Sequence, residues 1–191
     1  MTHLTIPSLI GYTWGALGLV WLAGLAFTKR TVHSEPMGAR LFQIAIILFG
    51  FTLLGNTRFS AGWLGENFLS PTRSLQIAGL VLTIGGCLFA IWARITLGNN
   101  WSGRATLKAG HELIVTGPYS LARHPIYTGL LLASIGTCLA SAKWHCILGL
   151  ALIVSGFAAK IGQEEKLMMQ TFPEAYPRYR QRVKALIPGL L

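Results

Sequence analysis

The sequence predicts an all-α membrane protein, a polytopic bundle of about five transmembrane helices. Charged residues make up only 12% of the 191 residues, whereas 52% are hydrophobic; soluble domains carry about 25% charged residues. The charged residues also leave long gaps, at 1–28, 41–57, 74–93, 125–142 and 144–159. Because roughly 17–25 apolar residues cross a hydrocarbon core of about 30 Å, these gaps are of transmembrane length or close to it.

The first three gaps predict spans at about 6–28, 41–57 and 74–93. The first begins without basic residues, and its apolar stretch is longer than the ~7–15 residues of a signal peptide. We therefore expect it to be a retained span. Only Lys143 separates the last two gaps, so we expect a tight helical hairpin over about 125–161. The alternative is a buried hairpin that does not cross the membrane.

The net charge of +10 follows the expected topology. With five spans and a cytoplasmic C-terminus, all but three of the 16 Lys and Arg residues lie on the cytoplasmic side. The exceptions are Arg58, Arg73 and Lys143. This asymmetry obeys the positive-inside rule, so we do not attribute the charge to nucleic-acid binding.

The three cysteines Cys87, Cys138 and Cys146 all fall in apolar segments. None has a second Cys or a His at metal-ligand spacing, so no metal site is expected. We expect small core residues here. A bond between Cys138 and Cys146 across the outer turn is the alternative.

Two polar stretches, at about 94–125 and 160–191, interrupt the apolar pattern; with roughly sixty residues they are too small to form a separate domain with its own core. They should fold against each other and against the cytoplasmic helix ends. The chain thus divides into N-terminal transmembrane helices at 1–93 and a core at 94–191. This core comprises a loop, the hairpin and a C-terminal tail.

The first polar stretch ends in Arg123-His124-Pro125, two residues before Tyr127. Proline is favoured in a first helical turn, so Arg123 and His124 should lie where the fourth helix begins. The pattern puts a cation, a titratable ring and a phenol at one helix mouth. For Arg123 alone, the alternative is a side chain that snorkels to the headgroups.

Glu164 and Glu165 are two of only six acidic residues. They lie near the cytoplasmic end of the fifth helix, where the helix dipole does not favour anions. Lys160 lies one turn earlier and could pair with one of them. The pair is a candidate to bind a cation or move a proton, the alternative being a solvated helix end.

The segment 108–119 contains Gly110, Gly117 and Pro118, which favour turns. Between them, Leu113–Val115 could line an apolar slot for a flat ring. The sequence has no GxGxxG after a strand, no HExxH, no GxSxG and no Asp. These absences argue against a Rossmann nucleotide site, a zinc protease and a serine hydrolase.

In the tail, the fifth helix should continue through Gln170 and break near Pro173. A short helix at about 174–186 would then hold Tyr176 and Tyr179 on one side. We expect this helix to be interfacial, with its aromatic rings at headgroup level.

Five motifs occur in order over the last half of the chain: LGNNWS (97–102), GHELIVTGPY (110–119), RHPIYTG (123–129), EEKL (164–167) and FPEAYPRY…IP (172–188). This order resembles the isoprenylcysteine carboxyl methyltransferase family. The RHP and Glu-pair elements are shared with a wider superfamily that includes phospholipid N-methyltransferases. The resemblance implies a methyltransferase dependent on S-adenosyl-L-methionine, with a membrane-embedded cofactor site and no Rossmann domain.

The resemblance also implies three groups of site residues. The cofactor would contact His111, Leu113, Val115, Gly117, Tyr119, His124, Tyr127 and Glu164. The catalytic group would comprise Arg123, Glu164, Glu165 and Lys160, and the acceptor would meet Arg94 and Trp101. The aromatic members could hold the sulfonium cation by cation–π contact. Lys160 stands where the family often has an arginine, and it cannot make the arginine fork.

The expected acceptor is an isoprenylcysteine or another lipophilic carboxylate, on the cytoplasmic face of a bacterial cell membrane. A carboxylate is ionised at neutral pH and needs a cation but no general base, whereas an amine acceptor such as a phospholipid needs a base. The sequence has both cations and glutamates at the mouth, so it leaves both acceptors open. Two further alternatives are a sterol-type reductase that grips a phosphate with Arg178, Arg180 and Arg182, and a non-enzymatic membrane protein.

Overall fold

The computed structural model describes residues 4–25, 37–98 and 113–187. Within these ranges the chain forms helices and no strand, which confirms the all-α prediction. The helices are α1 (Ile6–Leu25), α2 (Met37–Gly55), α3 (Arg73–Leu97), α4 (Pro125–Ser141), α5 (Trp144–Thr171) and α6 (Ala175–Arg182), with the short 3-10 turns η1 (Thr57–Phe59), η2 (Gly62–Gly65) and η4 (Gly117–Ser120).

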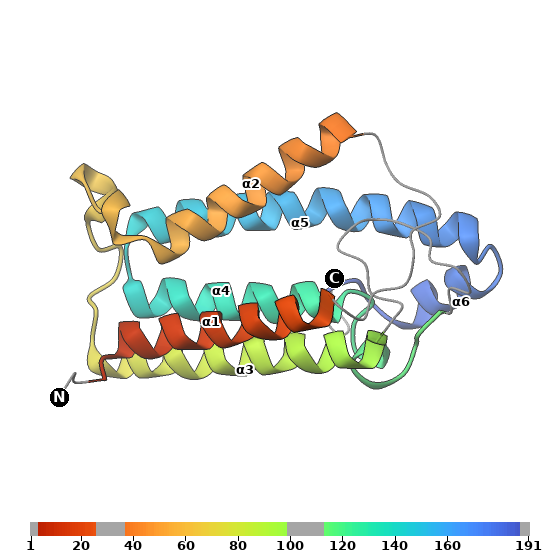
Figure 1. Cartoon of the computed structure of the whole chain (residues 1–191), viewed down its shortest axis with the longest axis horizontal. Coiled ribbons are helices and arrows are strands. Elements are labelled where there is room, and N and C mark those ends of the chain that lie inside the picture. Colours follow the sequence, from red (N-terminus) through yellow and green to blue (C-terminus); the bar gives the residue numbers. More distant parts are fainter. Residues whose placement is uncertain (1–3, 26–36, 99–112, 188–191) are drawn as a thin grey trace.

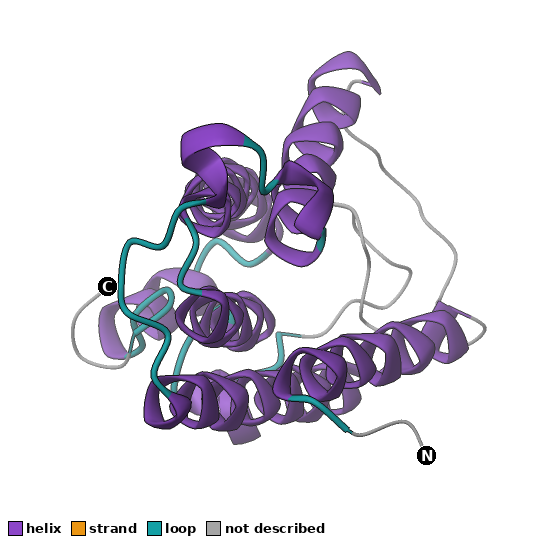
Figure 2. Cartoon of the chain, turned by 90° about the vertical axis from the view of Figure 1, so that its left-hand side faces the viewer, coloured by secondary structure: helices purple, strands orange, loops and turns teal. Residues whose placement is uncertain are grey.

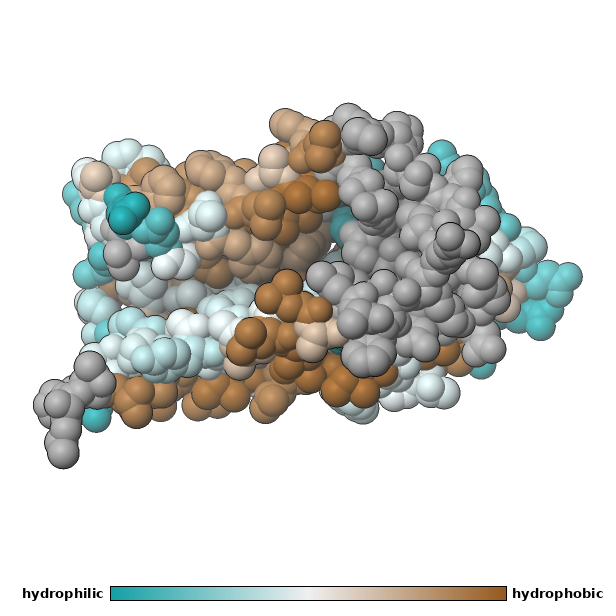
Figure 3. Space-filling view, viewed as in Figure 1, coloured by the Kyte–Doolittle hydropathy of each residue, from teal (hydrophilic) through white to brown (hydrophobic). Residues whose placement is uncertain are grey.

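Five long helices run side by side, and α6 lies at one end of them (Figure 1). Among the described residues, α1, α3 and α5 are long and apolar enough to cross a membrane, and α2 and α4 carry shorter apolar segments. The surface in Figure 3 is brown along the middle of the bundle and teal towards both ends, as a bilayer-embedded protein requires.

Helix α4 is the centre of the bundle, because it packs against α1, α2, α3 and α5. Figure 2 shows these helices end-on. The closest approach is between α3 and α4, where glycines face each other. A Cβ atom placed on Gly86 would lie 2.4 Å from Ala133 N, and one on Gly129 would lie 2.6 Å from Gly86 O. Small residues therefore allow the backbones to touch, as in other membrane helix pairs.

The predicted hairpin is formed by α4 and α5, which are joined by Ala142 and Lys143. Ala142 adopts a left-handed backbone (φ 54°) and ends α4 by donating its N–H to Cys138 O at 2.8 Å. Its own carbonyl accepts from Phe68 N at 2.8 Å, which ties the turn to the loop before α3. Cys138 and Cys146 are both buried and free, as expected of small core residues.

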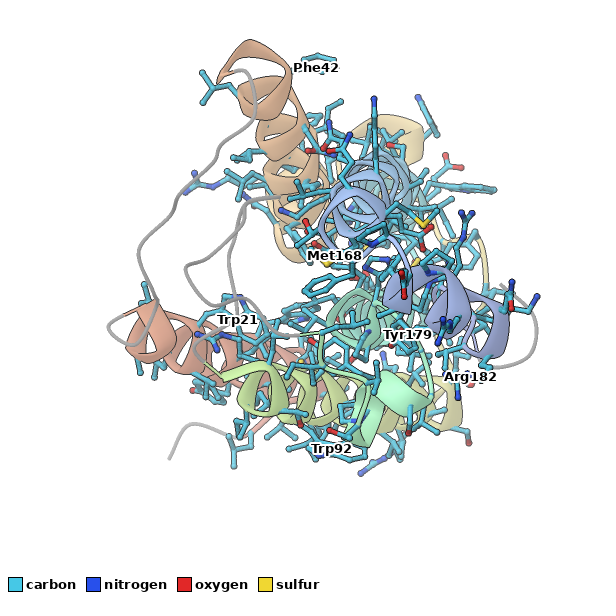
Figure 4. The ribbon with its side chains drawn as sticks, turned by 90° about the vertical axis from the view of Figure 1, so that its right-hand side faces the viewer. Trp21, Phe42, Trp92, Met168, Tyr179 and Arg182 are labelled. Carbon is cyan, nitrogen blue, oxygen red and sulfur yellow. The ribbon has the colours of Figure 1, made fainter. Side chains whose placement is uncertain are left out.

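The polar end of the bundle gathers the ends of α3 and α5, the start of α4, and α6 (Figure 1). Helix α5 continues to Thr171, as predicted, and α6 follows Pro173. The expected headgroup position of the α6 aromatic rings is wrong: Tyr176 is 2% exposed and Tyr179 6% exposed. In Figure 4 Tyr179 lies on the bundle side of α6 and Arg182 on its outer side. Burial inside the chain satisfies these rings better, because the Tyr179 hydroxyl finds a backbone acceptor at Tyr119.

Candidate active site

Arg123 and Glu165 form the central ion pair of the polar end. Arg123 lies just before α4, and Glu165 lies in the last part of α5. The Nε of Arg123 donates to Glu165 Oε1 at 2.9 Å, and its Nη2 donates to the same oxygen. The two side chains are only 7% and 13% exposed. Arg123 is therefore held inside the protein and does not snorkel to the headgroups.

Glu164, the neighbouring carboxylate, has its own partners. The hydroxyl of Tyr127 on α4 donates to Glu164 Oε1 at 2.6 Å. Lys160, one turn earlier on α5, places its Nζ 3.8 Å from the same oxygen, as the sequence spacing predicted. The ring of Tyr127 also stacks on those of His124 and Phe157, so part of its face is already covered.

His124 lies between the two carboxylates. Its Nδ1 is 3.5 Å from Glu164 Oε2, and its Nε2 is 3.4 Å from Glu165 Oε1. Burial by itself lowers the pKa of His124, but the hydrogen bonds and the charges of both glutamates outweigh burial. The net effect raises the pKa of His124 above its ordinary value of 6.5. The ring of His124 therefore lies between two carboxylates that favour its protonated form.

The chain after α6 crosses the start of α4 and fixes its backbone. Arg123 N donates to Lys184 O at 2.8 Å, and His124 N donates to Ala185 O at 2.9 Å. The hydroxyl of Thr128 donates to Leu186 O at 2.8 Å. Backbone N–H groups at a helix start have no partner within the helix, so this tail strap (residues 183–186) supplies the missing acceptors.

Three buried phenols line the junction between η4 and α6. The hydroxyl of Tyr179 donates to the carbonyl of Tyr119. Burial raises the pKa of both phenols, and Glu164 raises that of Tyr119 further. Burial also raises the pKa of Tyr176 to about 12. All three phenols therefore stay neutral at physiological pH.

Six of the predicted site residues meet in one network: Arg123, His124, Tyr127, Lys160, Glu164 and Glu165. Tyr119 lies close enough for the charge of Glu164 to raise its pKa, and its carbonyl accepts from Tyr179. Gly117 has the positive φ (58°) that its turn requires. Leu113 is half-buried and Val115 is exposed. His111 and Trp101 lie outside the described residues.

Arg94 forms its hydrogen bonds with backbone carbonyls and not with the two glutamates. It is buried, and its Nη2 and Nη1 donate to Gly24 O at 2.9 Å and Gly98 O at 3.0 Å. These carbonyls belong to the ends of α1 and α3, so Arg94 ties two helix ends together.

Sequence reasoning did not include Arg180 or Thr128 in the site. Arg180 on α6 places its Nε 3.4 Å from Glu165 Oε2. Thr128 holds the tail strap. The signal for the position of Arg180 was the three-residue spacing of Tyr176 and Tyr179. This spacing puts both rings on one face of α6, and burial of that face turns α6 towards the bundle.

Comparison with known proteins places this geometry in a family. The model of the isoprenylcysteine carboxyl methyltransferase (ICMT) family matches residues 79–170. Protein-S-isoprenylcysteine O-methyltransferase A of Arabidopsis thaliana is 31% identical over 172 residues, which cover 88% of this chain and 79% of that protein. The chain belongs to the isoprenylcysteine carboxyl methyltransferase family. The resemblance of the five motifs is thereby confirmed.

Other ICMT relatives support the same assignment. Protein-S-isoprenylcysteine O-methyltransferase B of Arabidopsis thaliana is 32% identical over 113 residues, 58% of this chain and 57% of that protein. A solved structure of the eukaryotic intramembrane Ras methyltransferase ICMT matches with a TM-score of 0.56 and 25% identity, over 81% of this chain and 55% of that one. This ICMT-family chain is therefore an integral membrane protein.

The matches cover only part of several relatives. It spans between 41% and 61% of the length of the first five curated relatives it matches. The matched part nevertheless includes α4 and almost all of α5, which carry most of the ionic network. A carboxyl methyltransferase family implies a methyl donor.

Proposed function

We propose that this chain is a membrane methyltransferase that uses S-adenosyl-L-methionine to methylate the carboxylate of an isoprenylcysteine or a similar lipophilic acceptor. The observation that carries the proposal is the contact between two distant motifs of the family resemblance. Arg123, His124 and Tyr127 of RHPIY meet Glu164 and Glu165 of EEKL in one buried network. Buried charges with this many partners mark a functional site more often than a structural one.

The residues present suit this cofactor. Two buried polar atoms, His124 Nε2 and Gln163 Oε1, lack a well-formed hydrogen bond among the described residues, although His124 Nε2 lies 3.4 Å from Glu165 Oε1. A ligand with an amino group, a carboxylate and hydroxyls can use an open donor and an open acceptor. Glu164 would hold its amino or ribose groups, His124 its carboxylate, and Leu113 and Tyr119 its flat ring. When bound, the cofactor supplies a methyl group that a carboxylate oxygen accepts without first losing a proton.

The charge balance favours a carboxylate acceptor over an amine. Among the described residues, the three cations Arg123, Lys160 and Arg180 contact the two carboxylates Glu164 and Glu165, and His124 lies between them. An anionic acceptor is attracted to this excess of positive charge. An amine acceptor would need a free general base, but both glutamates are already held by cations. A phospholipid amine methyltransferase is accordingly not favoured.

The remaining alternatives have less support. A sterol-type reductase would need its arginines grouped around a phosphate. Instead, Arg180 pairs with Glu165, and Arg178 lies 3.9 Å from Glu174 on the same helix. A non-enzymatic membrane protein is not favoured either, because the chain belongs to a methyltransferase family.

The proposed orientation puts the polar end in the cytoplasm of a bacterial cell. Of the described Lys and Arg residues, Arg58, Arg73 and Lys143 lie at the opposite end of the bundle, and the others with described side chains lie at the polar end. The positive-inside rule then makes the polar end cytoplasmic. A lipid-borne acceptor can keep its tail in the bilayer while its head reaches the network.

A methyl-transfer assay tests the proposal. Purified protein is incubated with methyl-labelled S-adenosyl-L-methionine and, separately, a prenylcysteine analogue, a long-chain fatty acid and phosphatidylethanolamine. We expect label on the carboxylate compounds as an ester that base releases as methanol. Label on the amine lipid alone would overturn the choice of acceptor. Failure of the folded protein to bind the cofactor in calorimetry would overturn the enzyme itself.

A further inference from the structure

The cations of the network differ in how many of their donors are already used. Arg123 gives Nε and Nη2 to Glu165, and Nη1 to the carbonyls of Val183 and Arg180. It is also almost completely buried. Arg123 cannot turn towards an incoming carboxylate without releasing both Glu165 and the tail strap.

Two other cations are equally committed. Lys160 is largely buried and lies 3.8 Å from Glu164. Arg94 is buried, and its two terminal nitrogens hold the carbonyls at the ends of α1 and α3. Neither presents a fork of donors towards the surface.

Arg180 differs from these three. Its side chain is 53% exposed, and its closest approach to Glu165 is through Nε, at 3.4 Å from Oε2. In the described part of the chain, the guanidinium of Arg180 forms no ion pair other than the one with Glu165. A guanidinium whose end edge is open can bind a carboxylate through two parallel hydrogen bonds.

We propose that Arg180 binds the carboxylate head of the lipophilic acceptor at the entrance to the network. This inference rests on the proposed function and deepens it by assigning acceptor recognition to α6. The Nε contact with Glu165 holds the guanidinium beside the buried ion pair, while half of the side chain stays exposed at the polar end. A carboxylate held there lies near the Arg123–Glu165 pair, and the guanidinium charges of Arg180 and Arg123 offset the repulsion from Glu165.

Binding to a pair of matched compounds tests the inference without any need for turnover. The protein is placed in phosphatidylcholine nanodiscs, and a fluorescent prenylcysteine analogue is compared with its carboxamide, which has the same tail and no charge. We expect the wild-type chain to bind the carboxylate about tenfold more tightly, which corresponds to about 1.4 kcal/mol. The Arg180→Gln variant should bind both compounds equally, and Arg180→Lys should keep part of the preference.

Arg178→Gln is the matched control. Arg178 lies on the same short helix, is 73% exposed and pairs only with Glu174. We expect this variant to keep the wild-type preference. The inference is overturned if Arg180→Gln keeps the preference, if the control loses as much, or if the wild-type chain shows none.

The two proposals fail in different ways. If the wild-type chain methylates a carboxylate and Arg180→Gln leaves the acceptor KM unchanged, the role of Arg180 is wrong and the enzyme assignment stands. If the wild-type chain binds no S-adenosyl-L-methionine, the enzyme assignment is wrong, while the carboxylate preference is still measured. A structural role for Arg180 would lower kcat and the melting temperature together, whereas acceptor binding raises the KM alone.

Discussion

Arg123 donates twice to a single oxygen of Glu165, from Nε and from Nη2. The other oxygen of Glu165 is left to Arg180 on α6. One carboxylate thus joins the start of α4 to the tail helix. The tail strap then closes the arrangement by accepting hydrogen bonds from the backbone of Arg123 and His124.

Replacement of Arg123 should destabilise the chain. Removal of one partner from a buried ion pair costs about 3–5 kcal/mol. We expect Arg123→Gln to cost near the lower limit, because Arg180 and His124 still contact Glu165. For a chain of this size, that lowers the melting temperature by about 10 °C. Thermal melting in detergent measures the effect, with exposed Arg178→Gln as the control. Equal melting of both variants would show that the pair does not hold the fold.

The hydroxyl of Tyr127 should matter separately from its ring. Tyr127→Phe keeps the stacking on Phe157 but removes the 2.6 Å hydrogen bond to Glu164. We expect a loss of about 1.5–3 kcal/mol, since the acceptor is charged. Melting and calorimetric titration with the cofactor should both report the loss. Tyr12→Phe, on the exposed face of α1, should change neither.

His124 should make stability depend on pH. Its pKa is raised in the folded chain, whereas the unfolded value is about 6.5. The stabilisation is therefore fully present below about pH 6.5 and disappears as the pH rises through the folded pKa. The melting temperature of the wild type minus that of His124→Asn should shrink as the pH increases from about 5.5 to about 9. A difference that stays constant would mean that His124 does not link the glutamates as an imidazolium.

The tail strap should contribute through Thr128. Thr128→Val removes the hydrogen bond to Leu186 O, and loss of a neutral hydrogen bond costs about 1 kcal/mol. We expect a melting temperature lower by about 2–4 °C. Thr52→Val is the control, because the hydroxyl of Thr52 is exposed and bonds only within its own helix. If both variants melt alike, the strap does not stabilise the start of α4.

The glycine contact between α3 and α4 should tolerate no side chain. Gly86→Ala places a Cβ 2.4 Å from Ala133 N, so the helices must separate. Overpacking of this kind costs about 1–3 kcal/mol. Gly85→Ala, one residue away, meets nothing within 4 Å and should be harmless. The yield of folded protein and its melting temperature distinguish the two, and equal results would contradict the close packing.

Much of the site was accessible from sequence for specific reasons. Glu164 and Glu165 stand out because acidic residues are scarce in this chain. Pro125 identifies the start of a helix, which places Arg123 and His124 at its mouth. The charge-free gaps give α1 to α4 to within a few residues, and they give the start of α5, which continues past its gap to Thr171.

The tail was harder to predict. A tyrosine suits both a headgroup region and a buried position with a hydrogen-bond acceptor, and composition does not distinguish the two. Tyr176 and Tyr179 turned out to be buried. The contact of Arg180 with Glu165 and the acceptors of the tail strap depend on how α6 folds back after Pro173. The three-residue spacing of the two tyrosines indicates a buried face of α6, but it does not identify the partners of Arg180 or of the tail strap.

The most direct test of the central claim compares Glu165→Gln with Glu174→Gln in the methyl-transfer assay. Glu165 lies between Arg123, His124 and Arg180, whereas Glu174 is 88% exposed on α6. If the ionic network positions the reacting groups, Glu165→Gln should lower the rate on a lipophilic carboxylate about a hundredfold while the protein stays folded. Glu174→Gln should match the wild type. A folded Glu165→Gln variant with wild-type activity would contradict the account.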